Sequence, residues 1–253
     1  MTWSATQYSR FERERTRAVH DLLAGVPAPQ VARATDLGCG PGNSTQALLQ
    51  RYPEAQVVGV DNDRDMLDKA RARLPQARFE LRDIAQWRPE GPQDLILANA
   101  SLQWLPRHAQ LYPKLVRQLR EGGSLAVQTP DNLDEPAHRR LREIASRNPW
   151  AARFVDTRLP ARHGAAFYYD LLAPLCSQVD IWRTTYHHPL PDADAVVQWF
   201  KGSALRPYLA RLDTQEQEAF VQAYAEAIRE DYPSTANGKV LLPFPRLFLV
   251  ATR

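Results

Sequence analysis

Four residues at alternate positions, Asp36, Gly38, Gly40 and Gly42, form the stretch of this sequence whose chemistry is easiest to anticipate. A short run at 31–34 (VARA) precedes them and could be a buried strand, and Leu48 and Leu49 follow with helical spacing. Glycines let the backbone turn sharply and let a ligand approach main-chain atoms. The first turn of the following helix offers unpaired N–H groups that suit an anionic group. The spacing therefore predicts a loop that cradles a nucleotide.

The spacing of the glycines indicates which class of nucleotide this loop would bind. A dinucleotide fingerprint reads G-x-G-x-x-G and opens directly into its helix, whereas residues 38–42 read G-x-G-x-G. With an aspartate two residues before the first glycine, the stretch resembles motif I of the class I S-adenosylmethionine-dependent methyltransferases. The spacing disfavours an NAD-linked oxidoreductase. An ordinary glycine-rich turn without a ligand stays open, because so short a motif also occurs by chance.

Two further acids follow at the ends of predicted strands. Residues 56–61 (QVVGVD) read as a buried strand that ends in Asp61, 23 residues after Gly38, and residues 78–83 (RFELRD) end in Asp83. A carboxylate at the end of the second strand can accept hydrogen bonds from ribose hydroxyls, and Asp83 can accept one from an adenine amino group. Each aspartate could instead be a helix N-cap. The joint spacing favours the ligand interpretation.

Predicted strands and helices alternate along the first half of the chain. We expect a helix that ends near Gly25, a helix over 63–74, a strand over 94–100 and a strand over 124–128. A helix marked by Leu111, Leu115 and Leu119 should close at Gly122 and Gly123. Alternation of this kind predicts an α/β fold with a parallel, doubly wound sheet that binds ligands at the carboxyl ends of its strands.

The alternation stops at Pro130. Residues 131–170 read as helix and loop, 179–186 as a strand, 192–231 as helical and 240–251 as a terminal strand. We therefore expect a single domain over 1–253, with a core of about 26–130, 175–190 and 238–253. A helical cap made from 1–25, 131–170 and 192–235 should be inserted over that core.

Composition excludes several classes of protein. The 253 residues carry a net charge of only +3, and no block of like charges indicates a nucleic-acid-binding arm. No apolar run is long enough for a membrane span, and the first residues lack the apolar core of a signal peptide. Two cysteines, Cys39 and Cys176, give neither metal-ligand spacing nor a disulfide framework. We expect a soluble, cytoplasmic monomer without a metal, nucleic-acid or membrane partner.

Several longer stretches, in order along the chain, resemble one family. They are 36–45 (DLGCGPGNST), 98–106 (ANASLQWLP), 125–132 (LAVQTPDN), 179–186 (VDIWRTTY), 205–207 (LRP) and 244–248 (FPRLF). On these stretches the chain is identified as a member of the trans-aconitate 2-methyltransferases, with nothing recognisable over 145–165. The resemblance implies methyl transfer from S-adenosylmethionine to one carboxylate of trans-aconitate, which gives the monomethyl ester and S-adenosylhomocysteine. It also implies a Rossmann-like, seven-stranded sheet whose last strand is antiparallel, and a cytoplasmic enzyme.

Such a reaction asks little of acid–base catalysis. A carboxylate that titrates near 4 is already ionised at neutral pH, and the sulfonium is already activated. Alignment of oxygen, methyl carbon and sulfur can contribute roughly 7–11 kcal/mol. We therefore expect no catalytic base. His108 should lie at a helix start. His187 and His188 could contact a substrate carboxylate, but a surface pair is the favoured interpretation.

The resemblance and the strand ends together suggest site residues. We expect Gly38, Gly40 and Gly42 beside the methionine and ribose, Asp61 on the ribose, Asp83 and Ile84 on the adenine, and Asn99 and Leu102 on the sulfur side. The full expected cofactor set also includes Asp36, Asn62 and Trp104. The residues that we expect to bind a tricarboxylate substrate are Tyr8, Trp182, Arg183, Tyr186, Arg206 and Arg246.

Alternatives to these assignments stay open. Each arginine could be a structural ion pair, and the aromatic residues could belong to the core. The enzyme could methylate another small carboxylic acid or a hydroxyl group. A protein that binds the cofactor but has lost its substrate site would also fit the loop.

Overall fold

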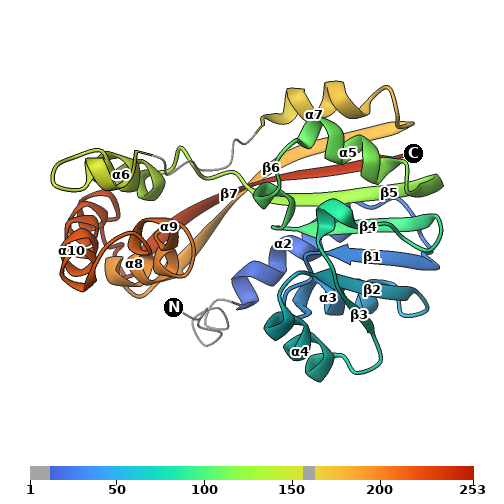
Figure 1. Cartoon of the computed structure of the whole chain (residues 1–253), viewed down its shortest axis with the longest axis horizontal. Coiled ribbons are helices and arrows are strands. Elements are labelled where there is room, and N and C mark those ends of the chain that lie inside the picture. Colours follow the sequence, from blue (N-terminus) through green and yellow to red (C-terminus); the bar gives the residue numbers. More distant parts are fainter. Residues whose placement is uncertain (1–11, 156–162) are drawn as a thin grey trace. The chain divides into compact units, whose positions relative to one another are not determined.

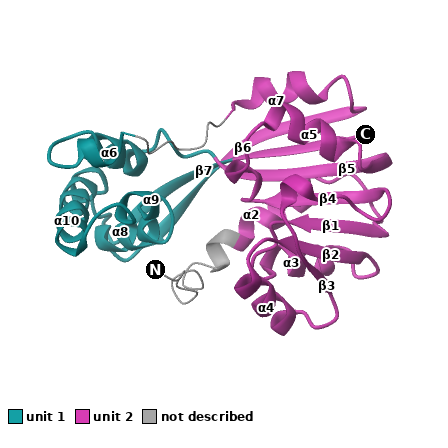
Figure 2. Ribbon diagram, in the orientation of Figure 1, with its two compact units in different colours: residues 1–12, 131–159, 185–246 teal, residues 13–130, 160–184, 247–253 magenta. Residues whose placement is uncertain are grey.

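The computed structural model describes residues 12–155 and 163–253, with side chains from residue 16 onward, and divides into two compact units (Figure 2). Unit 1 comprises residues 1–12, 131–159 and 185–246, and unit 2 comprises residues 13–130, 160–184 and 247–253. Tyr8, one of the expected substrate residues, lies outside the described part of the chain.

A seven-stranded sheet runs in the order β3-β2-β1-β4-β5-β7-β6 (Figure 1). Its strands are β1 (Arg33–Leu37), β2 (Gln56–Asp61), β3 (Arg78–Leu81), β4 (Gln93–Asn99), β5 (Leu119–Pro130), β6 (Gln178–Leu190) and β7 (Val240–Thr252). Strands β1 to β5 pair in parallel. Reciprocal bonds from Gly122 N–H to Arg253 O and from Arg253 N–H to Gly123 O mark β7 as antiparallel. The expected doubly wound sheet with an antiparallel last strand is confirmed.

The helices of unit 2 connect these strands. They are α2 (Glu12–Ala24), α3 (Asn43–Arg51), α4 (Arg64–Arg73), α5 (His108–Val116) and α7 (Ala165–Leu172), with short 3₁₀ turns η1 (Ile84–Gln86) and η2 (Leu102–Trp104). Asp63 caps α4, since its carboxylate accepts from the N–H groups of Asp65 and Met66. Residues 13–24 of α2 belong to the same unit as the sheet, and Leu22 and Leu23 are buried there.

Several expected boundaries are wrong. The strand expected over 78–83 ends at Leu81, and the strand expected over 124–128 begins at Leu119. The first strand begins at Arg33 rather than at residue 31, and the helix expected to reach Leu119 ends at Val116. Leu119 pairs with Gln93, whereas Ser124 pairs with Leu95, so residues 120–123 form an irregularity inside β5. The glycine pair that suggested a helix end therefore lies within a strand.

Unit 1 is mainly helical. It holds α6 (Pro136–Ala145), η3 (Ala151–Arg153), α8 (Ala193–Lys201), α9 (Arg206–Leu209) and α10 (Thr214–Asp231), together with the outer parts of β6 and β7. α10 begins with a capping box between Asp213 and Glu216. It packs against α6 and α8 around a core that includes Phe200, Phe220 and Tyr224. These helices fill the segments that were expected to be helical.

Candidate functional site

The glycine loop between β1 and α3 packs tightly at two of its three glycines. All three have positive φ angles, of 75° for Gly38, 52° for Gly40 and 91° for Gly42. A Cβ on Gly38 would lie 2.3 Å from the Cβ of Ser101, and one on Gly42 would lie 3.3 Å from the Cα of Ala70. No side chain fits at Gly38 without displacing backbone. The loop is therefore built against the segment that follows β4.

Gly40, unlike Gly38 and Gly42, lies beside open space. Apart from its chain neighbours, no described residue places a heavy atom within 4 Å of the position of its absent Cβ. Its N–H donates to Asp61 Oδ2 at 2.9 Å. Backbone beside open space, next to a fixed carboxylate, is the arrangement that a nucleotide-binding loop needs.

Asp61 is held in place from both sides. Its second oxygen, Oδ1, accepts from the N–H of Asp63 at 2.9 Å, and the side chain is half-buried. Each carboxylate oxygen has a further lone pair, so Asp61 can also accept from a ribose hydroxyl. The neighbouring Asn62 is exposed.

Asp83 lies two residues after the end of β3, whereas Asp61 is the last residue of β2. Its Oδ1 accepts from the Ala85 N–H at 2.8 Å, so the N-cap alternative is confirmed. The side chain is exposed and the cap uses one of its two oxygens. Ile84, the first residue of η1, is half-buried. Because β2 and β3 are parallel and in register, Asp61 and Asp83 lie at the same edge of the sheet.

Asp36 lies beneath the loop rather than on its surface. The residue is fully buried, and its Oδ2 accepts from Ser44 Oγ at 2.7 Å and from Thr45 Oγ1 at 2.6 Å. Burial raises the pKa of this carboxyl to about 6, although the two hydroxyl hydrogen bonds oppose that change. Asp36 therefore joins the end of β1 to the first turn of α3.

The segment after β4 forms the other wall of the loop. Asn99 ends β4 and is half-buried, and Ala100 has a φ of 54°, in the left-handed region that side chains disfavour. Ser101 Oγ donates to Leu37 O at 2.6 Å, directly before Gly38. The segment is thereby clamped onto the end of β1.

His108 holds the same segment at the next residue, Leu102. Its Nε2 lies 3.0 Å from Leu102 O, and its Nδ1 lies 2.8 Å from the Tyr168 hydroxyl. A carbonyl can only accept, so the proton is on Nε2 and the Tyr168 hydroxyl donates to Nδ1. Burial lowers the pKa of His108, which favours this neutral form. His108 lies at the start of α5, as expected; Leu102 is fully buried and Trp104 is 61% exposed.

Four buried side-chain oxygens around the loop accept no hydrogen bond from any residue in the described ranges. They are Asp36 Oδ1, Asn43 Oδ1, Asn99 Oδ1 and Gln103 Oε1. β1 and β4 are neighbours, with Asp36 opposite Leu97, so these oxygens lie around the carboxyl ends of two adjacent strands. A buried acceptor without a partner costs roughly 1–3 kcal/mol. The arrangement suits a ligand that carries hydrogen-bond donors. Sequence reasoning did not select Asn43 or Gln103, since nothing in the local pattern indicates that they are buried.

The expected substrate residues are divided between the two units. In unit 2, Trp182 stacks on Phe248 with ring centroids 5.0 Å apart and also borders Gly25, which supports the core alternative. Arg183 is exposed.

In unit 1 the structure brings two of the expected residues together. Arg246 is buried, and its guanidinium carbon lies 4.9 Å from the ring centroid of Phe244 and 6.0 Å from that of Tyr186. Arg206 begins α9 and is exposed.

The expected surface pair of histidines is wrong for one member. Tyr186, His188 and Leu190 are buried along β6, whereas His187 is exposed. Strand alternation sends neighbouring side chains to opposite faces. His188 stacks on Trp199, with ring centroids 5.0 Å apart.

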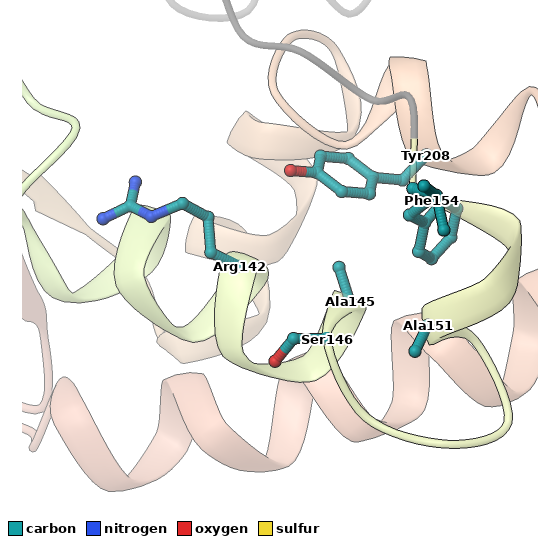
Figure 3. A pocket seen from close by; sticks show the side chains of 7 residues that line it. Arg142, Ala145, Ser146, Ala151, Phe154 and Tyr208 are labelled. Carbon is teal, nitrogen blue, oxygen red and sulfur yellow. The ribbon is translucent and has the colours of Figure 1, made fainter.

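A hollow of about 340 Å³ is present in unit 1 (Figure 3). Its lining residues are Arg142, Ala145, Ser146, Ala151, Phe154, Val155 and Tyr208. Polar and apolar side chains both line it, and its cation, Arg142, already donates to Leu133 O at 2.7 Å. We assign it no role.

Comparisons with known proteins define the class. A model of the methyltransferase domain matches residues 34–123. The solved YcgJ protein from Bacillus subtilis covers 94% of this chain and 98% of its own, with a TM-score of 0.61 and 13% identity. The match to phosphoethanolamine N-methyltransferase 2 of Haemonchus contortus, solved with S-adenosylhomocysteine, covers 93% of this chain and 52% of that chain, with a TM-score of 0.56 and 13% identity. The fold is that of the α/β methyltransferases.

A closer relative identifies the family. The trans-aconitate 2-methyltransferase of Azoarcus sp. (strain BH72) is 52% identical over 256 residues, covering 100% of this chain and 99% of that protein. The chain belongs to the trans-aconitate 2-methyltransferase family. No helix within the described residues has the length and apolar character needed to cross a membrane.

Proposed function

We propose that the protein transfers the methyl group of S-adenosylmethionine to a carboxylate of trans-aconitate, giving the monomethyl ester and S-adenosylhomocysteine. The observation that carries this proposal is the 52% identity over the full chain with a protein of that name. The glycine loop and the acids at the ends of β2 and β3 support the same cofactor independently.

The residues around the loop fit S-adenosylmethionine. Open space at Gly40 leaves room for the ligand, and Asp61 is fixed beside it as a ribose acceptor. The acceptor oxygens without a described partner match a ligand with ammonium and hydroxyl donors. We assign the cofactor to Gly38, Gly40, Gly42, Asp61, Asn62, Asp83, Ile84, Asn99, Leu102 and Trp104, with Asp36 supporting the loop from below.

The protein's part in the reaction is positioning. Bound S-adenosylmethionine supplies an already activated methyl group. The segment after β4 forms a fixed wall beside the loop, because Ser101 is bonded to Leu37 O and the adjacent Leu102 O is bonded to His108. A substrate carboxylate is ionised near neutral pH, so we assign no residue as a catalytic base. Alignment and exclusion of water supply the rate enhancement.

We propose that unit 1 forms the cap of one functional domain and carries substrate-binding residues. Its buried cation, Arg246, lies against the rings of Phe244 and Tyr186, and a guanidinium is suited to recognising a carboxylate. Arg206, in the same unit, is an exposed cation that we also assign to the substrate, and Arg183, in unit 2, is a further exposed candidate. Trp182 acts mainly in packing.

A methyl-transfer assay tests the function. Labelled S-adenosylmethionine is offered with trans-aconitate, cis-aconitate, citrate and isocitrate in parallel. We expect selective turnover of trans-aconitate. Turnover of another of these acids would establish the alternative, a methyltransferase for a different small carboxylic acid or hydroxyl compound. Cofactor binding without turnover of any of them would keep the cofactor and discard the substrate.

The remaining assignments concern the state of the enzyme. We propose that it acts as a monomer in the cytoplasm. Light scattering coupled to size-exclusion chromatography tests the first point, and cell fractionation tests the second.

A further inference from the structure

Gln103 is a buried amide whose orientation is fixed. The side chain is 4% exposed, and its Nε2 donates to Ala100 O at 2.7 Å. Exchange of the amide nitrogen and oxygen would place two oxygens at that distance, so the hydrogen bond defines which end is which. Oε1 consequently points away from Ala100, and no residue in the described ranges donates to it.

The segment that carries Gln103 is rigidly held. Gln103 is the middle residue of η2, the short turn that follows β4. Ser101, directly before the turn, donates to Leu37 O, and the carbonyl of Leu102, the first residue of the turn, is bonded to His108 Nε2. Gln103 Oε1 therefore keeps its place before a ligand arrives, which removes an ordering cost from binding.

The sheet order indicates which end of the ligand lies near this oxygen. Strands run β3-β2-β1-β4, with Asp83 after β3 and Asp61 at the end of β2. A ligand with its adenine at β3 and its ribose at β2 extends its amino-acid end toward β1 and β4. That end carries an ammonium group, and the sulfonium lies next to it.

The acceptors at β1 and β4 match these charges. Asn99 Oδ1 is also buried and accepts from no described residue. Asn99 is the last residue of β4, the strand that precedes η2. Carbonyl oxygens aimed at a cation form charge-assisted hydrogen bonds, which are stronger than bonds between neutral groups. An acceptor left unpaired inside the protein is unfavourable. A cationic donor on the ligand would therefore pair these oxygens and gain stronger hydrogen bonds itself.

We propose that Gln103 Oε1, together with Asn99 Oδ1, accepts hydrogen bonds from the ammonium group of bound S-adenosylmethionine. This deepens the proposed function, because it rests on the methyl donor lying across the glycine loop. It assigns to Gln103 direct contact with the cofactor.

Two ligands and one substitution separate this contact from a structural role. S-adenosylhomocysteine retains the amino-acid group, whereas 5′-methylthioadenosine retains adenine, ribose and sulfur but lacks it. Gln103→Leu keeps the approximate volume and removes the acceptor. By titration calorimetry we expect the dissociation constant for S-adenosylhomocysteine to rise about tenfold, with that for 5′-methylthioadenosine unchanged. His20→Ala, at an exposed position of α2, serves as the control.

Other outcomes overturn the proposal. Equal weakening of both ligands would show that Gln103 only maintains the turn. Unchanged binding of both would show that Oε1 meets water alone. If Gln103→Leu fails to fold by circular dichroism, Gln103→Met provides the same comparison. The result is independent of the substrate, since a wild-type protein that binds S-adenosylhomocysteine but does not methylate trans-aconitate would refute the proposed reaction and leave this test readable.

Discussion

Asp36→Asn should remove a contribution that makes the wild-type protein less stable as pH rises. Replacement of an ordinary ion-paired carboxylate would have the opposite effect. Asp36 is fully buried, and burial raises its pKa from 3.8 to about 6 in the folded protein. The folded state therefore binds the proton more tightly than the unfolded state. The stability that this group contributes is fully present below the unfolded pKa and is lost as pH rises through the folded one.

The magnitude follows from the two pKa values. A difference between 3.8 and about 6, at about 1.4 kcal/mol per pH unit, corresponds to roughly 3 kcal/mol of stability lost by neutral pH. About half of this loss falls between pH 5 and pH 7.5. Asparagine retains an oxygen for Ser44 and Thr45 but carries no charge, so its stability should lack this component.

Urea denaturation followed by circular dichroism measures the effect. We expect the free energy of unfolding of wild type, relative to Asp36→Asn, to fall by about 1–2 kcal/mol from pH 5 to pH 7.5. Other carboxylates cancel in this difference, and the exposed Asp68→Asn provides a matched control. A difference that stays constant with pH would refute the argument that Asp36 is a buried acid whose charge is costly.

Three further substitutions test the site. Gly38→Ala should destabilise the protein by roughly 1–3 kcal/mol or more, because its Cβ would lie 2.3 Å from that of Ser101 at a positive φ; thermal and urea unfolding measure this, and an unchanged midpoint contradicts it. Asp61→Ala should abolish S-adenosylhomocysteine binding by removing the ribose acceptor and the partner of Gly40, whereas wild-type calorimetric affinity would end that assignment. Arg206→Ala should raise the KM for trans-aconitate several-fold and leave cofactor affinity alone, and unaltered kinetics would make Arg206 structural.

Short-range features could be predicted from the sequence because they depend on neighbouring residues. The turn at Gly38, Gly40 and Gly42, the acids that end β2 and follow β3, and the capping alternative for Asp83 are local properties of the backbone. The alternation of strands and helices likewise predicts the doubly wound sheet, and the antiparallel last strand followed from the resemblance to a family. His108 was correctly placed at the start of α5.

Errors arose where a local signal has two meanings. Gly122 and Gly123 suggested the end of a helix, but the pairing of β5 with β4 places them in a strand irregularity. The adjacent His187 and His188 look alike in sequence, and only the face of β6 that packs in unit 1 separates the exposed ring from the buried one.

The sequence by itself determined the order of elements, the glycine loop and the spacing of its acids, since these follow from backbone conformation and covalent distance. Only the tertiary structure decided which polar atoms are buried and which lack a partner. Asp36 became a buried acid, and Asn99 and Gln103 became unmatched acceptors, because strands and turns distant in sequence enclose them. Burial and hydrogen-bond satisfaction depend on every neighbouring segment at once, so no local pattern specifies them.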